Sequence, residues 1–461
     1  MKALLPIFAL AVGSASTVPA ASGEDSVAIR LEYYDLDHGT LNALLSAADS
    51  GDASSLRASV LERVQAGEAT QVESTYLHTK SGLSARVESI IEWIYPVQYD
   101  TPNSPQSVTG PVGADSDLIG SLTPNALETR NVGLILVVDP GARSDGEGSG
   151  IHLAQELCVY LGDNTYGQDE STVNHPVFYS LRDQVGFTAK RGHWTIVSVH
   201  PPPPAAVGAT PPRDRRILAL LRTDHSPHSE SDSPDEEPDD PRGDTPVPPA
   251  PISAQVGMLI EWFEMDSSSA TRLLDENPDA HADATALRET LRNWVTEERA
   301  SLFESAYLVT KSGQRAKSET SKHWIYPSEV APGNGGWVVV GPIDPAARLR
   351  TRVNYSSLKT RLLGTIVEAD PVVRPDGGTI DLELAPEIAE FGADRTIGYG
   401  TSSIEQPVFF SMKTQSSVAV RSGVPVVLSQ HSPRPADVIG PHFGSEKRIL
   451  CLVTARILKA K

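Results

Sequence analysis

The chain has 461 residues, two cysteines and a formal net charge of −20 at pH 7. This acidic balance argues against nucleic acid as a partner, because nucleic-acid binding depends on basic patches. Two cysteines cannot define a fold by disulfides, and the length predicts two to four domains, each able to bury its own core.

The first 22 residues have the layout of a secretory signal peptide. Lys2 precedes an apolar run over residues 3–12, and small residues follow, which predicts cleavage near Ala20 or Ala21. The run is too short to cross a bilayer, and no later segment has the roughly eighteen continuous apolar residues of a membrane helix. We therefore expect an exported chain without a transmembrane helix.

Two sequence landmarks occur twice at one spacing. Trp93-Ile94-Tyr95-Pro96 returns as Trp324-Ile325-Tyr326-Pro327, and Pro176-Val177-Phe178 returns as Pro407-Val408-Phe409. The differences 324 − 93 and 407 − 176 both equal 231, which indicates a tandem duplication. We predict a first repeat over residues 27–224 and a second over residues 254–461. Chemistry that the protein needs should then occur in both copies.

Residues 225–253 separate the two predicted repeats. The segment is rich in Asp, Glu, Ser and Pro, and Arg242 is its one basic residue. Because like charges repel and proline favours extended backbone, we predict a solvated spacer rather than a folded element.

Each copy is predicted to open with a strand and a helix. The strands cover residues 28–34 and 258–264. In the second copy an apolar stripe at helical spacing comprises Leu287, Leu291, Trp294 and Val295, and the matching residues of the first copy are Leu56, Val60 and Val64. We interpret this stripe as core rather than a ligand groove.

A hairpin is predicted next, over residues 73–79 and 304–310, with turns at Lys80-Ser81-Gly82 and Lys311-Ser312-Gly313. The return strands end at Pro96 and Pro327. The remainder of each copy reads as antiparallel strands. In the first copy they cover residues 133–138, 151–157, 177–181, 187–190, 195–199 and 216–222, and in the second 364–370, 379–384, 408–412, 417–421, 425–429 and 448–458.

Catalytic signatures are scarce. The sequence has no phosphate-binding glycine loop, no His-Glu-x-x-His zinc helix, no Cys-x-x-Cys pair and no Gly-x-Ser-x-Gly elbow. His200 and His431 are equivalent, and Ser198 and Ser429 recur two residues before them. Strand alternation would place each serine and histidine on one face, but no third group is evident from the sequence. We favour a structural role over a hydrolase.

The other polar candidates have simpler explanations. His225 and His228 lie in the spacer and have no counterparts in the second copy. Residues 139–148 could suggest a calcium turn, but their counterpart in the second copy, residues 370–377, reads as an ordinary hairpin loop. The recurring carboxylates Asp35/Asp37 and Glu264/Asp266 fit polar strand ends before a helix. Cys158 and Cys451 are not equivalent, so we favour two unpaired thiols, and a single bridge stays open. We predict no catalytic, cofactor-binding or metal-binding residues.

The second copy resembles the C-terminal β-domain of secretins, the multimeric outer-membrane channels of bacterial type II and III secretion and type IV pili. The resemblance lies in residues 360–373, 376–388, 407–411, 416–428 and 449–457, where Gly364 and Pro371 are followed by Asp376-Gly377 and an Ile-x-Leu-x-Leu-x-Pro run ending at Pro386. The first copy matches more faintly. The front halves are similar to regions of uncharacterised exported proteins of planctomycete and verrucomicrobial type.

Three segments depart from the secretin pattern. Ser429-Gln430-His431 stands where the family has Gly-Gly-Leu, residues 438–444 replace its Pro-x-Leu-Gly motif, and residues 151–157 have lost the regular alternation. The predicted runs are also often shorter than the nine to eleven residues of an outer-membrane strand.

The resemblance implies an α+β fold in which each copy has a small α/β front (strand, helix, hairpin) and an antiparallel, secretin-like β region. It further implies a non-enzymatic cell-envelope protein in the periplasm or outer membrane, with a structural or assembly role in secretion or pilus machinery. Homo-oligomers or secretion-system proteins are the implied partners. A soluble periplasmic binding module that has lost pore formation is the first alternative, and a hydrolase is the second.

Overall fold

The computed structural model describes residues 26–47, 52–100, 122–142, 148–166, 173–226, 254–332, 353–397, 403–433 and 446–458. The predicted signal peptide (1–22) and residues 227–253 of the predicted spacer lie outside these ranges.

Within the described residues, the two halves of the chain have the same order of elements. The first half contains β1 (Ser26–Asp37), α1 (His38–Ala47), α2 (Ser54–Gln65), β2 (Thr70–Lys80), β3 (Ala85–Asp100), β4 (Thr123–Ala142), β5 (Gly148–Tyr166), β6 (Val173–Lys190), β7 (Trp194–His200) and β8 (Arg215–Ser226). The second half contains β9 (Gln255–Asp266), α3 (Ser267–Glu276), α4 (Thr285–Thr296), β10 (Ala300–Lys311), β11 (Ala316–Pro332), β12 (Val353–Val373), β13 (Thr379–Ile397), β14 (Ile404–Arg421), β15 (Pro425–His431) and β16 (Lys447–Leu458).

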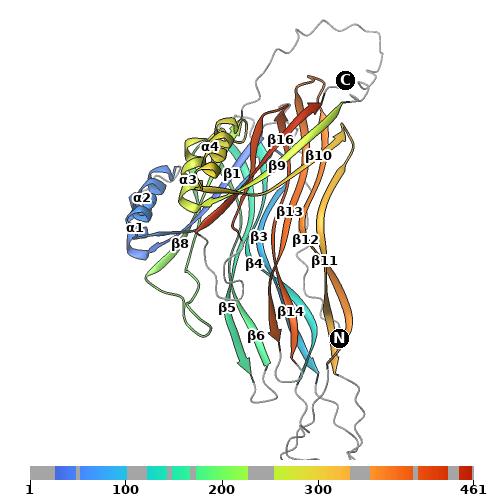
Figure 1. The fold of residues 1–461 in the computed structure, drawn as a ribbon. Coiled ribbons are helices and arrows are strands. Elements are labelled where there is room, and N and C mark those ends of the chain that lie inside the picture. Colours follow the sequence, from blue (N-terminus) through green and yellow to red (C-terminus); the bar gives the residue numbers. More distant parts are fainter. Residues whose placement is uncertain are drawn as a thin grey trace, which may run out of the picture.

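These strands form two eight-stranded antiparallel sheets that both halves share. The helix-covered sheet has the order β10-β9-β16-β15-β2-β1-β8-β7, and the long-stranded sheet has the order β11-β12-β13-β14-β3-β4-β5-β6. In each sheet, four strands of the second half are followed by the four equivalent strands of the first. Figure 1 shows the helices on one face of the helix-covered sheet and the long strands beyond its other face. The predicted antiparallel α+β fold is confirmed.

The core lies in layers on both faces of the helix-covered sheet. Between the sheets, Ile380, Leu382 and Leu384 of β13 are buried together with Met258 and Ile260 of β9, as the alternation in residues 379–384 predicts. On the outer face, Leu287, Leu291 and Trp294 of α4 pack on the strands, and Leu56 and Val60 do so in the first half. The predicted helix stripe is therefore core.

Strands of the long-stranded sheet are longer than the sequence predicts. The separate runs at residues 408–412 and 417–421 belong to β14, and those at 177–181 and 187–190 belong to β6. The prediction fails because Thr414 and Ser416 interrupt the apolar pattern while their side chains point into the protein. Both are buried, and their hydroxyls hydrogen-bond to groups of the other sheet.

The predicted hairpin forms its turn but not its pairing. Gly82 and Gly313 have φ of 78° and 75° at the two turns, as the Ser-Gly motif predicts. However, β2 pairs with β1 and β3 pairs with β4, so the chain passes from one sheet to the other at this turn. Local pattern fixes the turn, whereas burial of both strands' apolar faces between two sheets decides the pairing.

Gly133 and Gly364 occupy equivalent places in β4 and β12 where no other residue fits. Their φ values are 124° and 131°, and a Cβ at either position would overlap a backbone carbonyl oxygen, that of Ser89 or of Thr320. Neighbouring backbones therefore approach closely at the same point of both halves.

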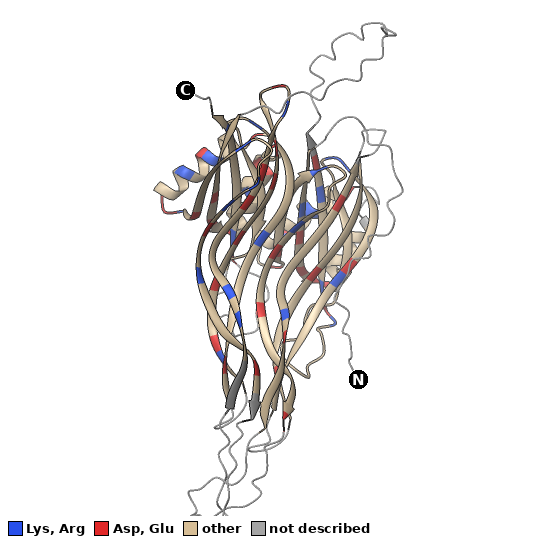
Figure 2. Cartoon of the chain, turned by 90° about the vertical axis from the view of Figure 1, so that its right-hand side faces the viewer, with Lys and Arg blue, Asp and Glu red and all other residues tan. Residues whose placement is uncertain are grey.

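Figure 2 shows that acidic and basic residues are interspersed along the long strands. Among the described residues no helix is long and apolar enough to cross a membrane.

Candidate functional site

The most distinctive part of the molecule is the join at which the second half meets the first within each sheet. In the helix-covered sheet, β15 pairs with β2 through Ser429↔Leu77 and Gln430↔Tyr76. The Thr75 hydroxyl donates to the Gln430 carbonyl oxygen at 2.8 Å, and the Gln430 amide donates to Ser74 Oγ at 2.6 Å. Side chains therefore reinforce a short backbone contact.

In the long-stranded sheet the join is longer, because β14 pairs with β3 from Phe409↔Glu92 to Gln415↔Arg86. Arg361 of β12 lies 2.7 Å from Glu92 of β3 and 3.0 Å from Glu387 of β13. Burial raises the pKa of Glu92, although Arg361 opposes the rise. The two sheets thus continue from one half into the other.

His431 lies between the sheets at this join. Its Nε2 contacts Thr414 Oγ1 at 3.0 Å and Ser429 Oγ at 2.9 Å, and its Nδ1 lies 3.0 Å from the Glu88 carbonyl oxygen and 3.2 Å from Ser89 Oγ. Burial lowers the pKa of His431 to about 4, so the neutral form predominates at pH 7. A neutral imidazole satisfies these groups without placing a charge in the core.

A buried ion pair joins the halves beside His431. Arg448 of β16 is fully buried, and its Nη2 lies 3.3 Å from Glu73 Oε1 of β2. Its Nε donates to Ser74 Oγ at 2.9 Å, and Glu73 also accepts from the Ser432 hydroxyl at 2.6 Å. Because both charges are removed from water, each depends on the other.

Four further charges connect the helices to the join. Glu32 of β1 is fully buried, with Arg30 at 2.7 Å and Arg57 at 2.6 Å, and Asp275 of α3 lies 2.8 Å from Arg30 and 3.2 Å from Arg57. Burial opposes ionisation of Glu32, yet the two guanidinium groups keep its pKa below the usual value. The Arg57 guanidinium also stacks 4.2 Å from the Trp194 ring centroid. This cluster fixes α3 of the second half onto the first half.

The equivalent cluster of the second half stays within that half. Glu261 is bound by Arg288 at 2.5 Å and by Arg292 at 3.3 Å. A glutamate on the strand with an arginine on the second helix therefore recurs, and it anchors each helix pair to its sheet.

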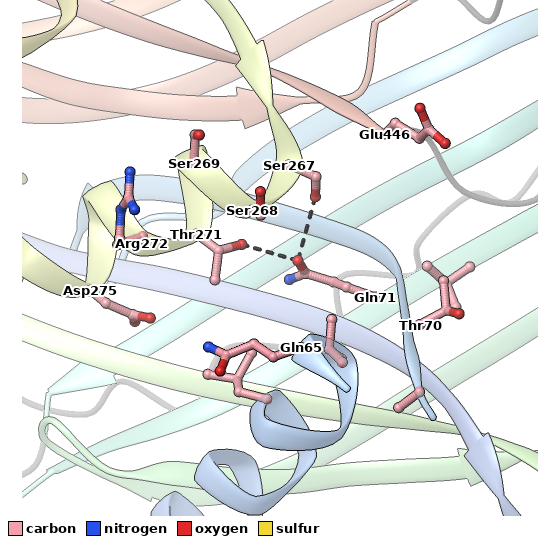
Figure 3. Close-up of a pocket in the computed structure, with 14 residues that line it drawn as sticks. Gln65, Thr70, Gln71, Ser267, Ser268, Ser269, Thr271, Arg272, Asp275 and Glu446 are labelled. Atoms are coloured by element: carbon pink, nitrogen blue, oxygen red, sulfur yellow. Dashed lines mark hydrogen bonds between the residues drawn. The ribbon is translucent and has the colours of Figure 1, made fainter. Parts of the chain in front are cut away.

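A cavity of about 820 Å³ lies at the join, between α2 of one half and α3 of the other. Figure 3 shows Ser267 and Thr271 directed at Gln71, whose Oε1 accepts from their hydroxyls at 3.4 and 3.0 Å. Its other polar lining includes Arg272 and Glu446, and no histidine or cysteine is among its lining residues. The cavity thus offers hydroxyl, amide and charged side chains to its interior.

His200 and Ser198 of the first half lie on one face, as strand alternation predicts. The Ser198 hydroxyl donates to Asp183 Oδ2 at 2.7 Å, and His200 Nε2 lies 3.0 Å from the same oxygen. Both therefore bind the carboxylate, and no serine-to-histidine bond is described. Asp183 is the third group that the sequence did not reveal. It lies on the other sheet, where Thr414 is its counterpart in the second half.

The Ser429 and His431 pair does make a direct contact, but both residues are buried. A substrate cannot reach them, and Thr414 replaces the acid that a catalytic triad requires. The recurring serine and histidine thus fill the space between two sheets.

The carboxylates at the strand ends have the structural roles that we expected. Asp35 lies 3.0 Å from Arg215, Asp37 accepts from the Thr40 backbone N–H at the start of α1, and Glu264 lies 2.6 Å from Lys447. Asp266 directly precedes α3 without capping it through its side chain.

The remaining candidates do not form a site in the described part of the chain. Cys158 and Cys451 are free and buried. His225 belongs to β8 but its side chain is not described, and His228 and residues 143–147 lie outside the described ranges. In the ranges that the structure describes, no group of three or more His, Cys, Asp and Glu could hold a metal ion.

Each sheet ends at two strands that have a partner on one side only. In the described residues these are β10 and β7 in the helix-covered sheet and β11 and β6 in the long-stranded sheet. The β10 and β11 strands are equivalent to β2 and β3, whereas β7 and β6 are equivalent to β15 and β14. The outer edges therefore repeat the two edges that meet at the join. We call them the β10/β11 edge and the β7/β6 edge.

Equivalent residues differ sharply in exposure between the join and the outer edges. Tyr307 of β10 is 58% exposed, whereas Tyr76, 231 positions earlier, is 5% exposed. Ile325 of β11 is 63% exposed against 5% for Ile94. Side chains that are buried at the join thus have exposed equivalents at the outer edge.

Comparison with known proteins finds no family model that matches and no match among curated proteins. Solved secretin structures are similar at low levels. The type II secretion system secretin GspD of E. coli K12 is 13% identical over 45% of this chain and 48% of that chain, with a TM-score of 0.20. The type III secretion injectisome secretin InvG of Salmonella is 10% identical over 67% and 88%, with a TM-score of 0.22.

The type IV competence pilus secretin PilQ of V. cholerae is 11% identical over 96% of this chain and 63% of that chain, with a TM-score of 0.20. The match spans about half the length of the type II secretins GspD and ExeD. These values are too low to assign the chain to the secretin family.

Proposed function

We propose that this protein is a non-enzymatic structural component of the bacterial cell envelope, with an assembly role linked to protein secretion or pilus machinery. The observation that carries the proposal is the arrangement of sheet edges. Two equivalent halves join edge to edge through both sheets at once. The same two kinds of edge remain unpaired at the outer strands of the sheets, β10 and β11 on one side and β7 and β6 on the other. A molecule with such edges can be extended by further copies that add edge to edge in both sheets.

The sequence pattern supports the same proposal. Gly364, Pro371, the Asp376-Gly377 turn and the Ile-x-Leu-x-Leu-x-Pro run to Pro386 are secretin-like and lie on β12, β13 and the turn between them. The secretory layout of residues 1–22 supports export to the periplasm or outer membrane.

Burial of the best catalytic candidates supports a non-enzymatic role. Ser429 and His431 are enclosed between the sheets, and Ser198 and His200 both bind Asp183 rather than each other. The repeated polar residues therefore stabilise the fold in both halves.

Fractionation of the native host cells, followed by negative-stain imaging of the purified protein, tests this function. We expect a large assembly in the envelope fraction that survives mild detergent. A monomer that is recovered in buffer alone, with none in a membrane fraction, would contradict the proposal.

The cavity at the join favours one alternative, a soluble periplasmic binding module. Its hydroxyl and amide lining suits a small polar ligand. The alternative predicts a monomeric or dimeric protein whose thermal stability rises with a periplasmic extract of small molecules. Unchanged stability in that extract would remove it.

A further inference from the structure

We propose that the bare edges bind a second copy of this chain, head to tail, with the β10/β11 edge of one copy extending the β7/β6 edge of the next. This inference rests on the proposed assembly role and names its partner and register. The join inside the chain provides the template, because it unites the same two kinds of edge in both sheets.

The internal join is heterologous: a β15/β14 edge meets a β2/β3 edge, which is a different surface. An interface of this kind always leaves one unused edge of each kind. Here the unused edges are β7/β6 and β10/β11, so a second copy can repeat the contact without any new surface. Pairing β7 with another β7 would have no counterpart inside the chain.

The backbone shape of the bare edges matches that of the joined ones. A β-bulge at Val72 of β2 recurs at Phe303 of β10, and a bulge at Leu428 of β15 recurs at Val197 of β7. Bulges set the local bend and twist of a strand. The bulge of β10 is therefore equivalent to that of β2, and the bulge of β7 to that of β15. We expect the bare edges to bend as the strands of the internal join do.

The register follows from the internal pairs by the spacing of 231 residues. Gln430↔Tyr76 predicts Val199 opposite Tyr307 of the second copy. In the long-stranded sheet, Lys413↔Glu88 predicts Arg182 opposite Glu319.

Charges that join the halves recur at the bare edges. Glu304 is the counterpart of Glu73 at the spacing of 231. In the last strand of each half the spacing is 232, and Arg216 is the counterpart of Arg448, because Arg216 pairs with Leu36 as Arg448 pairs with Met265. The buried Arg448–Glu73 pair therefore predicts an ion pair between Arg216 and Glu304 of the second copy. Arg182 and Glu319 likewise keep the opposite signs of the register partners Lys413 and Glu88, whose own ion pairs are with Glu387 and Arg86. Complementary charge would fix the register of the second copy.

Polar residues of the internal join are replaced by apolar ones at the bare edges. Val199 stands for Gln430, Ala306 for Thr75 and Val309 for His78. Val199 and Val309 are exposed in the single chain. Exposed apolar side chains on an unpaired strand favour a protein strand as the partner, since pairing would cover both the side chains and the backbone groups.

Disulfide trapping between separately tagged chains tests the register. One chain carries Val199→Cys and the other Tyr307→Cys, and the mixture is oxidised and analysed on a non-reducing gel. We expect a crosslink that joins the two tags in the folded, full-length protein. The native Cys158 and Cys451 are buried and should not react.

Three matched mixtures are the controls. Val199→Cys with itself tests a symmetric β7 pairing, Tyr307→Cys with itself tests a β10 pairing, and Val199→Cys with Val309→Cys tests a two-residue slip. A stronger crosslink in any of these, or none in the main mixture, would overturn the proposed contact.

Charge exchange supplies a second test that does not depend on cysteine chemistry. Arg216→Glu should weaken self-association by about tenfold or more, and adding Glu304→Arg should restore it. Arg213→Glu makes the same change of charge at an exposed residue three positions away and should leave association near the unaltered level. Analytical ultracentrifugation measures each variant. Failure of the double variant to recover would contradict the Arg216–Glu304 pair.

The outcomes separate this inference from the proposed function. A large envelope assembly without the Val199–Tyr307 crosslink would overturn the edge pairing alone. A crosslink in a protein that is absent from the envelope fraction would support the pairing and overturn the envelope role.

Discussion

Arg448 and Glu73 form an ion pair between the two halves, with Nη2 and Oε1 3.3 Å apart and both residues buried. They are 375 positions apart in the sequence, yet they hold β16 and β2 at the centre of one sheet. The contact shows that the two halves are stabilised as one body.

Removing one partner of this pair should destabilise the whole chain. Glu73→Ala leaves the Arg448 guanidinium buried without its carboxylate, which costs about 3–5 kcal/mol of unfolding free energy. Urea unfolding followed by circular dichroism measures the loss. Glu304→Ala at the equivalent exposed position should change the stability of the single chain by less than about 0.5 kcal/mol. Equal losses would show that the join does not depend on the pair.

The stability of the join should fall in mild acid. His431 has its pKa lowered by burial from 6.5 to about 4, so between these values the unfolded chain binds a proton that the folded chain does not. Stability is therefore complete above pH 6.5 and is lost as the pH falls toward 4, by roughly 3 kcal/mol for this group. Burial lowers the pKa of His78 in the same direction.

Urea unfolding at pH 7.5 and pH 5 measures this loss. His431→Gln keeps a hydrogen-bonding side chain without a titrating group, so its difference between the two pH values should be clearly smaller. An identical difference in the variant would assign the acid sensitivity to other groups.

Gly133→Ala and Gly364→Ala should each destabilise the long-stranded sheet. The new Cβ would meet a backbone carbonyl oxygen, and both sites have positive φ, which together cost about 1–3 kcal/mol or more. Gly378→Ala is the control, because its Cβ would have nothing within 4 Å. Thermal unfolding compares the three variants, and a neutral Gly133→Ala would mean that the strands can separate there.

Glu32→Gln should loosen the helices of the first half and the join together. Arg30 and Arg57 would lose the carboxylate that offsets their charges, whereas Asp275 would remain as a partly exposed counter-ion. We expect a loss of about 3 kcal/mol. Hydrogen exchange should rise in α2 and α3 in this variant, whereas Glu261→Gln should raise exchange in α4 with α3 unaffected.

Much of the fold can be predicted from the sequence because its local patterns are physical. The alternation at Ile380, Leu382 and Leu384 places one face of β13 in the core, and the spacing of Leu287, Leu291 and Trp294 does so for α4. The Ser-Gly turn at Gly82 forms with positive φ. Each of these depends on neighbours within about ten residues.

Features that depend on distant strands could not be predicted in this way. The strands on either side of Gly82 enter different sheets, and Thr414 looks like an interruption although it bonds His431 between the sheets. The partner of Ser198 and His200 is Asp183, which no sequence spacing indicates. Pairing of β15 with β2 was equally hidden, because a repeat shows that two edges are alike but not that they meet.

The hydrogen bond from Thr75 to Gln430 spans 355 positions. During synthesis the first half is complete long before β14 and β15 exist, so the β2 and β3 edges must wait without their partners. An exposed strand edge can pair with any other, including β10 or β11 arriving from the same chain. The order of synthesis therefore leaves mispairing between the halves possible until the last strands have been made.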